Sequence, residues 1–464
     1  MNPPERTLMA SQPTEASQPT QRGLGKVVAA SMAGTVAEWY EFLLYSAASA
    51  LVFGTLFFPK TDNALDGVLS ALLIYAVGFL ARPIGGVVFG VYGDRFGRKK
   101  LLQVSLLMVG ISTFGMGCLP GFGDIGYWAP GLLVILRLVQ GFAVGGEWGG
   151  AILLVSEHSS DQRRGFWASW PQAGLPLGNL VATMVLSVLA FVLPESAFLG
   201  WGWRLAFWLS AVVIIIGYYI RTHVEDAPIF RESQKAEEQR SENRSGVSQA
   251  IHQYPRQIAI AMGLRVAENI LYQIVVTFSI TYLAFKVEME IEDVLLAMLI
   301  PHLLHFILIP LIGGLTDRIG RKPVYLTGAL LMVLWAFISY PLMNTGNVVL
   351  VVVALTLGLA VHALIYAPQA AMMSEMFPTR IRYSGVSLGY QVTSIFAGSV
   401  APFIATYLLR EYHSWIPIAG YLAVAAGVSL VAIVAARETR GISLRDIDAQ
   451  DRARFPLSVS QPRG

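Results

Sequence analysis

Long apolar segments are the feature that most restricts how this chain of 464 residues can fold. A helix needs about 20 apolar residues to cross the hydrocarbon core of a bilayer, where the backbone must satisfy its own hydrogen bonds. Twelve segments meet this condition: 27–58, 65–92, 99–119, 128–156, 164–193, 203–221, 256–285, 294–314, 323–342, 347–373, 383–409 and 414–436. The sequence therefore predicts an all-α membrane protein with twelve transmembrane helices.

The composition agrees with a chain whose surface mostly faces lipid. Charged residues make up 14% of the chain, whereas soluble domains contain about a quarter. The net charge is only +3 and the basic residues lie in particular loops, which argues against a nucleic acid as partner. The single cysteine, Cys118, excludes an intrachain disulfide and a cysteine-based metal cluster. We therefore expect the lipid bilayer and a small organic molecule as partners, and neither a metal nor a cofactor.

Lysine and arginine residues in the short loops predict the orientation. Loops near 95–100, 163–164, 318–322 and 380–382 are basic, whereas the alternate loops at 59–66, 119–129, 286–293 and 343–346 carry few basic residues or none. The basic loops and both termini are therefore predicted to be cytoplasmic, in the plasma or inner membrane. The predicted divisions are a disordered tail (1–26), a six-helix bundle (27–221), a polar linker (222–254), a second six-helix bundle (255–437) and a C-terminal tail (438–464).

The two halves contain related motifs. GVYGDRFGRKK at 90–100 is echoed by GGLTDRIGRKP at 313–323, so that Asp94 corresponds to Asp317, 223 residues later. A second pair consists of SEHSSDQRRG at 156–165 and SEMFPTRIRYSG at 374–385. Each pair follows the second or the fourth helix of its half. Two parallel repeats that meet near the bilayer midplane are an architecture of secondary transporters.

These motifs resemble those of the major facilitator superfamily, and the resemblance covers nearly the whole chain. Four longer motifs are similar to the metabolite:proton symporter family, namely GTVAEWYEFLLY at 34–45, FLARPIGG at 79–86, RLVQGFAVGGEWGGA at 137–151 and EMFPTRIRYSGVSLGYQ at 375–391. That family includes carriers of α-ketoglutarate, citrate, shikimate and proline or betaine. The resemblance implies a symporter with H⁺ as the coupling ion, whereas the residues themselves do not decide between H⁺ and Na⁺. We expect no cofactor and a functional monomer, and the sequence leaves the oligomeric state open.

Ionisable residues within the apolar segments are the candidate functional residues, because each costs at least about 2.5–3.5 kcal/mol to insert and needs a partner or a watered cavity. One interpretation is that they pair with one another as interhelical ties. The other is that the arginines bind a substrate carboxylate while a carboxylate carries the proton. The N-terminal half contains more of this charge, so we expect the coupling chemistry there.

The predicted substrate contacts are Arg82, Arg137, Trp39, Tyr40, Gln172, Arg265, Asn269, His305 and Gln391. The predicted proton-binding groups are Glu38, Glu41, Glu147 and Glu268. Ordinary packing is the simpler interpretation of the aromatic rings, and the two glutamines suit either substrate binding or helix contacts.

The Asp and Gly spacing that the two repeated motifs share predicts a cytoplasmic gate, whereas positive-inside topology alone would explain only the sign of these charges. An aspartate such as Asp94 can offset the positive end of the helix that follows it. The resemblance implies ion pairs that hold the cytoplasmic side closed. One set would contain Asp94, Arg98, Glu157 and Arg164, and the other Asp317, Arg321, Glu375 and Arg382. Arg95 and Arg318 are further candidates for the gate.

Several other functions are disfavoured by missing motifs. The sequence contains no phosphate-binding G-x-x-x-x-G-K-[ST] loop of a primary pump and no H-E-x-x-H motif of a membrane enzyme. The leading hypothesis is proton symport of a small carboxylated metabolite by alternating access. The alternatives are an osmolyte symporter for proline or betaine, and a channel or transporter-derived sensor. The short tail after Arg437 lacks the heptads of a coiled coil, which lowers the osmosensor alternative.

Overall fold

The computed structural model describes residues 21–96, 98–145, 153, 155–157, 159–224 and 246–455, and the regular structure of this part is helical. The first half contains α1 (Gln21–Ala48), α2 (Gly54–Leu56), α3 (Ala64–Phe96), α4 (Arg98–Cys118), α5 (Phe122–Ile125), α6 (Trp128–Val144), α8 (Arg164–Val192), α9 (Glu195–Ala197) and α10 (Trp203–Val224). Two π-helical turns lie in this half, η1 (Ser49–Phe53) and η2 (Phe198–Gly202).

The second half repeats the pattern of long helices. It contains α12 (Gly246–Gln253), α13 (Pro255–Gln273), α14 (Ser279–Phe285), α15 (Ile291–Leu296), α16 (Leu299–Ile319), α17 (Arg321–Met343), α18 (Val348–Ser374), α19 (Thr379–Thr393), α20 (Ala401–Tyr412), α21 (Ile416–Ala435) and α22 (Leu444–Arg454). The π-helical turns η3 (Ile274–Phe278) and η4 (Ser394–Gly398) lie between α13 and α14 and between α19 and α20. The first long helix of each half thus contains a π-helical turn, a feature that is frequent at functional sites.

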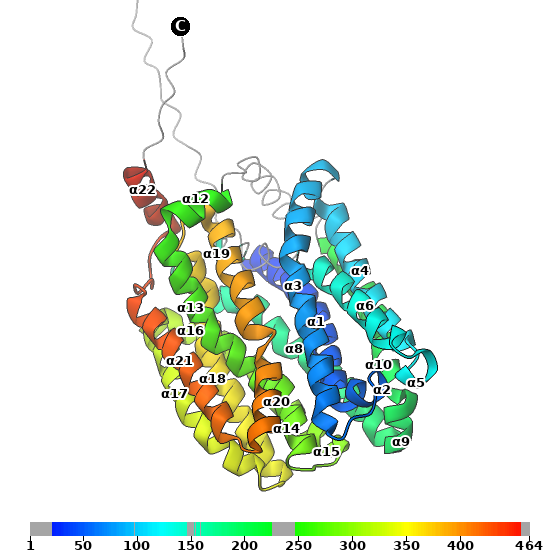
Figure 1. Cartoon of the computed structure of the whole chain (residues 1–464). Coiled ribbons are helices and arrows are strands. Elements are labelled where there is room, and N and C mark those ends of the chain that lie inside the picture. Colours follow the sequence, from blue (N-terminus) through cyan, green and yellow to red (C-terminus); the bar gives the residue numbers. More distant parts are fainter. Residues whose placement is uncertain are drawn as a thin grey trace, which may run out of the picture.

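The helices form two groups that lie side by side. Figure 1 shows α1, α3, α4, α6 and α10 in one group and α13 and α17 to α21 in the other. Between the groups, α8 packs against α16 and α18, and α3 packs against α20. Each of the twelve predicted segments corresponds to one helix or to consecutive helices, although the helix of segment 128–156 is described only to Val144 before a gap.

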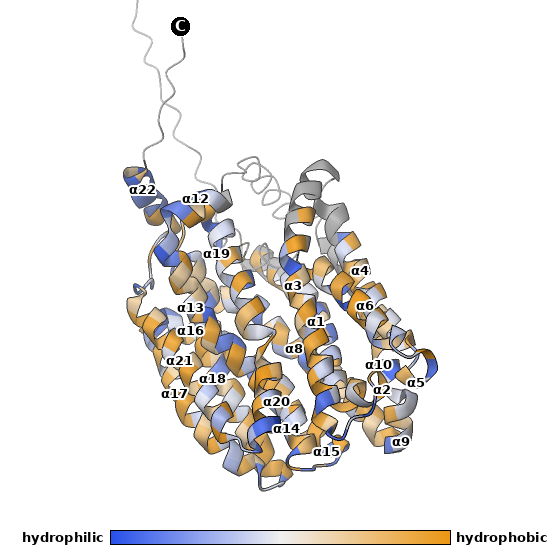
Figure 2. Ribbon diagram, viewed as in Figure 1, coloured by the Kyte–Doolittle hydropathy of each residue, from blue (hydrophilic) through white to orange (hydrophobic). Residues whose placement is uncertain are grey.

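The outer surface of the bundle is apolar. Large side chains such as Ile84, Ile111, Phe191 and Val431 are more than 60% exposed, and apolar residues cover the helices in Figure 2. Within the described residues, nine helical segments are long and apolar enough to cross a membrane, and two shorter apolar helices, Gln103–Cys118 and Trp128–Val144, accompany them. This surface is suited to lipid rather than to water.

Glycines allow α3 and α6 to approach each other closely. A Cβ atom at Gly85 would lie 1.8 Å from the carbonyl oxygen of Phe142, and one at Gly141 would lie 1.8 Å from that of Gly78. Small residues permit such backbone contact between membrane helices. The contact positions α3 and α6 so that Arg82 and Arg137, one from each helix, lie in the same part of the bundle.

The C-terminal tail is attached to the second half at the end that is predicted to be cytoplasmic. In α22, Asp448 accepts hydrogen bonds from the backbone N–H and the hydroxyl of Thr379 at the start of α19, at 2.6 and 2.7 Å. Asp451 accepts hydrogen bonds from Arg380 and Tyr254. Part of the predicted tail therefore forms a helix that packs on the bundle.

Candidate functional site

Two buried arginines of the first half lie among aromatic rings. The guanidinium of Arg82 lies 4.4 Å from the ring centre of Phe42 and 4.3 Å from that of Phe79. That of Arg137 lies 4.3 Å from the ring centre of Tyr45 and 4.8 Å from that of Tyr75. Such ring faces attract a cation, but they do not replace the hydrogen bonds that a guanidinium offers.

Both arginines retain donors without a partner among the described residues. Nε and Nη2 of each guanidinium are buried without a hydrogen bond. The nearest carboxylate to Arg82 is Glu38, at 3.9 Å between Nη2 and Oε1. Arg137 donates to the amide oxygen of Gln140. The site therefore contains positive charge that is incompletely neutralised, an arrangement that favours an anionic ligand.

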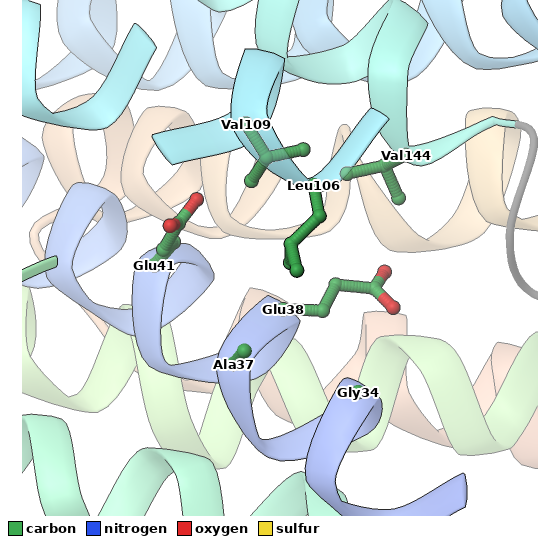
Figure 3. A pocket seen from close by; sticks show the side chains of 7 residues that line it. All are labelled: Gly34, Ala37, Glu38, Glu41, Leu106, Val109 and Val144. Carbon is green, nitrogen blue, oxygen red and sulfur yellow. The ribbon is translucent and has the colours of Figure 1, made fainter. Parts of the chain in front are cut away.

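Glu41 and Arg137 are joined through neutral side chains. The Gln140 amide donates to the hydroxyl of Thr113 at 2.7 Å, and that hydroxyl donates to Glu41 Oε2 at 2.8 Å. Figure 3 shows Glu38 and Glu41 on α1 beside a small pocket lined by residues of α4 and α6, among them Leu106. The two carboxylates thus lie on the side of α1 that faces these helices, as their spacing of three residues predicts.

A second cluster of buried ionisable groups lies in the C-terminal half. Arg265 Nη1 lies 2.5 Å from Glu268 Oε2 on the same helix, α13. Glu268 Oε1 lies 3.2 Å from Nε2 of His362 on α18. His362 Nδ1 lies 2.9 Å from Nε2 of His305 on α16. Asn269 donates to Glu268 at 3.3 Å. Three helices therefore contribute to one continuous polar chain.

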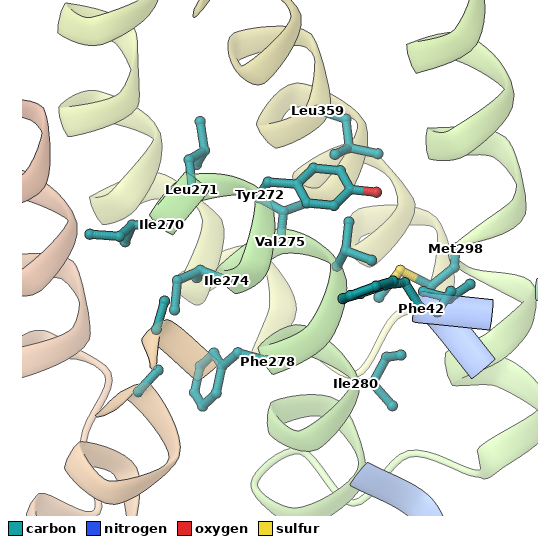
Figure 4. Close-up of a cluster of buried hydrophobic side chains, with 14 of the residues drawn as sticks. Phe42, Ile270, Leu271, Tyr272, Ile274, Val275, Phe278, Ile280, Met298 and Leu359 are labelled. Atoms are coloured by element: carbon teal, nitrogen blue, oxygen red, sulfur yellow. The ribbon is translucent and has the colours of Figure 1, made fainter. Parts of the chain in front are cut away.

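A small pocket lies between these two clusters and is shared by both halves. Its wall is formed by Trp39, Phe42, Leu43, Ser46, Tyr75 and Asn179 of the first half and by Tyr272, Gln273, Val276 and Thr277 of the second. Figure 4 shows Phe42 beside Tyr272 and its apolar neighbours. The arginines lie behind Phe42 and Tyr75, and the histidines lie behind Tyr272, whose ring centre is 4.9 Å from that of His362.

Contacts across the pocket hold the two halves together. Gln273 donates to the hydroxyl of Tyr75 at 2.9 Å, and Asn179 donates to the hydroxyl of Tyr272. The ring of Trp39 meets that of Tyr272 edge to face at 5.6 Å. These polar contacts would be broken when the halves separate at this level.

The remaining predicted substrate contacts have different surroundings. Trp39 lines the pocket, as described above, whereas Tyr40 donates to the carbonyl oxygen of Ala206 on α10 at 2.9 Å and therefore packs within the first half. Gln172 donates to the carbonyl oxygen of Tyr366 at 3.0 Å, so it connects α8 to α18 across the two halves. Gln391 has a buried amide oxygen without a partner among the described atoms. Glu147 lies outside the described residues.

The cytoplasmic gate residues join the halves instead of forming two separate sets. Arg164 of the first set lies 2.9 Å from Glu375 of the second, and Arg382 lies 2.9 Å from Glu157. Arg321 also contacts Glu375, at 3.2 Å. The predicted grouping is corrected in this respect: these two ion pairs cross the interface, because the start of α8 packs beside the end of α18 there.

The aspartate of the second repeated motif also acts across the interface. Asp317 accepts hydrogen bonds from the N–H groups of Gly165 and Phe166, both at 2.9 Å, at the start of α8. The start of the next helix, α17, is instead bound by Glu438 of the tail, through the N–H of Arg321 at 3.0 Å. The expectation that Asp94 offsets the positive end of the helix after it concerns a side chain outside the described part of the chain, whereas its counterpart Asp317 binds the start of α8 in the other half.

The other residues of the predicted gate either form no ion pair with a described residue or have side chains outside the described part of the chain. Arg318 is exposed and forms no ion pair with a described residue. The side chains of Asp94, Arg95 and Arg98 lie outside the described part, although the backbone there belongs to α3 and α4.

At the opposite end of the bundle, Arg410 lies 2.5 Å from Asp66 across the two halves. The pocket is therefore closed by contacts at both ends.

Sequence reasoning missed residues that complete both clusters. His362 lies within an apolar segment and meets the criterion by which the other ionisable residues were selected, so it should have been included. Thr113, Tyr75, Asn179 and Gln273 carry no such signal, because neutral polar side chains are common in membrane helices. Among the described residues, no group of three or more His, Cys, Asp and Glu side chains is placed to bind a metal ion.

Comparison with known proteins agrees with this architecture. A model of the sugar (and other) transporter family matches residues 26–250 and 231–450, and the solved structures with the same fold include a proton:xylose symporter of the major facilitator superfamily. The chain belongs to this superfamily. The resemblance and the twelve-helix fold predicted from the sequence are confirmed, and the chain is a multi-pass membrane transporter rather than an enzyme.

The transporter is similar to several curated proteins over most of its length. The inner membrane metabolite transport protein YhjE of Escherichia coli K12 is 37% identical, over 90% of this chain and 95% of its own. The shikimate transporter of the same strain is also 37% identical, over 90% and 95% of the two chains. The proline/betaine transporter of that strain is 32% identical over 91% and 85%. Among solved structures, a D-xylose–proton symporter has the same fold, with a TM-score of 0.69 at 18% identity over 90% and 99% of the two chains.

Proposed function

We propose that the transporter carries a small carboxylated metabolite together with a proton by alternating access. The observation that supports this proposal is the pair of arginines, Arg82 and Arg137, whose buried donors lack partners directly behind the pocket wall. A buried guanidinium without a hydrogen-bonded anion is costly. A substrate carboxylate that reaches these donors when Phe42 or Tyr75 moves would recover that cost.

The carboxylates near the arginines supply the second part of the proposal. Glu41 is joined to Arg137 only through Gln140 and Thr113, and Glu38 lies at the limit of contact with Arg82. A proton on either carboxylate leaves the adjacent arginine free for the substrate anion. Proton and anion then cross together as a neutral pair, which lowers the electrostatic cost of their passage.

The experiment is uptake by the purified protein in lipid vesicles with an imposed pH gradient, for a panel of mono-, di- and tricarboxylates, shikimate and betaine. Accumulation of one carboxylate that depends on the gradient is expected. Arg82→Gln and Arg137→Gln should each reduce it at least about tenfold, since loss of a charged hydrogen bond costs roughly 1.5–3 kcal/mol. Arg204→Gln is the control, because Arg204 binds the carbonyl oxygens of Gly117 and Leu119 at 2.9 and 2.6 Å, away from the pocket. Full uptake in both arginine variants would refute the proposal.

A proline- or betaine-type osmolyte is the second candidate. Aromatic rings such as Phe42 and Trp39 next to Glu38 suit the cationic end of a zwitterion, and a curated relative is named a proline/betaine transporter. Competition by betaine but not by dicarboxylates would favour this candidate. Flux without saturation or counterflow would instead indicate a channel.

A further inference from the structure

The polar chain of the C-terminal half has a single consistent hydrogen-bond direction. An ionised Glu268 accepts only, so Nε2 of His362 donates to it across 3.2 Å. A neutral imidazole that donates from one nitrogen accepts at the other, so Nδ1 of His362 accepts from Nε2 of His305 across 2.9 Å. Nδ1 of His305 then carries a lone pair, and this buried atom has no partner among the described residues.

This arrangement connects Nδ1 of His305, a proton acceptor without a partner among the described residues, to the carboxylate of Glu268. We propose that Glu268 is the group that binds the transported proton, that His305 and His362 deliver it, and that its binding releases Arg265 for the substrate carboxylate. The inference rests on the proposed proton symport. Among the proton-binding groups predicted from the sequence it selects Glu268 in place of Glu38 and Glu41, and so moves the proton site to the half opposite to the one in which the coupling chemistry is expected.

The transfer leaves charge and atoms balanced. A proton from water binds Nδ1 of His305, the proton on its Nε2 moves to Nδ1 of His362, and the proton on Nε2 of His362 moves to Oε1 of Glu268. Both rings are neutral at the end, each with its proton on the other nitrogen, and Glu268 is a carboxylic acid. Release to the opposite side reverses these steps or occurs directly from Glu268.

Arg265 is the group that senses this change. Its neighbours are Glu268 at 2.5 Å, the amide oxygen of Gln369 at 3.2 Å and the ring of Tyr390 at 3.6 Å from the guanidinium carbon. Its Nε has no hydrogen bond within the described part of the chain. Once Glu268 is protonated, Arg265 lacks a counter-charge among these neighbours, so a substrate carboxylate would restore it.

The cluster is close to the central pocket. The ring of Tyr272, which lines the pocket, lies over both histidines, with its centre 6.3 Å from that of His305 and 4.9 Å from that of His362. The other titratable groups around the cluster are His302 on α16, Tyr325 on α17, Tyr366 on α18 and Tyr390 on α19. His302 donates from Nδ1 to the carbonyl oxygen of Met298 at 2.7 Å and is not part of the chain.

The first test needs no substrate. Infrared difference spectra of the purified full-length protein are recorded while the pH is lowered, and the carbonyl band of a buried carboxylic acid is followed. We expect Glu268→Gln to remove one such band and His302→Gln, a matched buried histidine one turn from His305, to retain it. An unchanged set of bands in Glu268→Gln would overturn the proposal, whatever the protein transports.

The second test measures substrate counterflow and pH-gradient-driven uptake separately in lipid vesicles. Glu268→Gln holds the site in the neutral state, so the ratio of gradient-driven accumulation to counterflow should collapse, whereas His302→Gln should keep the wild-type ratio. His305→Gln leaves the ion pair of Arg265 and Glu268 in place, so it is the variant to use if Glu268→Gln does not fold. We expect it to slow gradient-driven uptake at least tenfold. Gradient-driven uptake at the wild-type rate in both variants, or equal losses in His302→Gln, would contradict the relay.

The two tests distinguish the failure of this inference from that of the proposed function. If the wild type shows the Glu268 band but no gradient-driven uptake of any carboxylate in the panel, the proton site stands and the proposed substrate class is wrong. If the wild type accumulates a carboxylate but Glu268→Gln removes no band, the symport stands and the proton binds elsewhere.

Discussion

Arg137 and Glu41 show how single residues set the charge balance in this bundle. A direct ion pair would neutralise both groups, but Gln140 and Thr113 lie between them and form the hydrogen bonds instead. Each charge therefore remains responsive to a ligand. The charge of Arg82 is likewise incompletely neutralised, because its contact with Glu38 is long at 3.9 Å.

Thr113 offers a test of this network at the scale of one hydroxyl group. Thr113→Val keeps the shape of the side chain but leaves the Gln140 amide and Glu41 without their shared partner, at a cost of about 1–3 kcal/mol. We expect gradient-driven uptake to fall roughly tenfold. Thr113→Ser retains the hydroxyl and should remain close to the wild type. Equal uptake in the valine and serine variants would show that the network has no role.

At the scale of helices, close backbone contact between α3 and α6 positions the two arginines. Gly141→Ala places a methyl group 1.8 Å from the carbonyl oxygen of Gly78, so the helices must move apart. We expect a loss of about 1–3 kcal/mol in stability, as for other overpacked sites, measured as a lower thermal unfolding midpoint in detergent. Gly131→Ala is the control on the same helix, because no atom lies within 4 Å of its added Cβ. Similar midpoints for both variants would argue against the packing role.

Docking of α22 should depend on Asp451 and on pH. Burial alone would raise the pKa of Asp451, but hydrogen bonds from Arg380 and Tyr254 and the charge of Arg380 outweigh this and lower it. Because the folded-state pKa is lowered, docking is stabilised at neutral pH and weakens as the pH falls below the usual aspartate pKa of about 4. Asp451→Asn should show the weakened state already at pH 7.

Hydrogen exchange of the amides in residues 444–454 measures this docking. A lower protection factor, which compares the exchange rate with the intrinsic rate at the same pH, is expected in Asp451→Asn at pH 7 and in the wild type at low pH. Asp446→Asn, a change of an exposed aspartate in the first turn of the same helix, should have a smaller effect. Protection that is the same in all three proteins would mean that other contacts hold the helix.

At the scale of the whole molecule, the proposed alternating access requires that the contacts between the halves at the predicted cytoplasmic end open during each cycle. The hydroxyl oxygens of Ser156 and Ser374 lie 2.6 Å apart across this interface, at equivalent positions of the repeat. In a background with Cys118→Ala, the double variant Ser156→Cys and Ser374→Cys should form a disulfide on oxidation. Counterflow should then stop and return on reduction. Either single cysteine variant is the control, and normal counterflow by the cross-linked protein would exclude opening at this level.

The sequence alone determined the membrane helices, the two repeats and the superfamily, because these follow from apolar length and from motifs that are local in the chain. It also selected most of the buried charges, since any ionisable residue in an apolar segment stands out. It did not determine their partners. Glu268 meets His362 and His305, and Arg164 meets Glu375, only because helices distant in sequence pack together, and the neutral side chains that complete each network carry no signal of their own. Partner choice depends on distances of a few ångströms, and these are decided by the packing of the whole bundle.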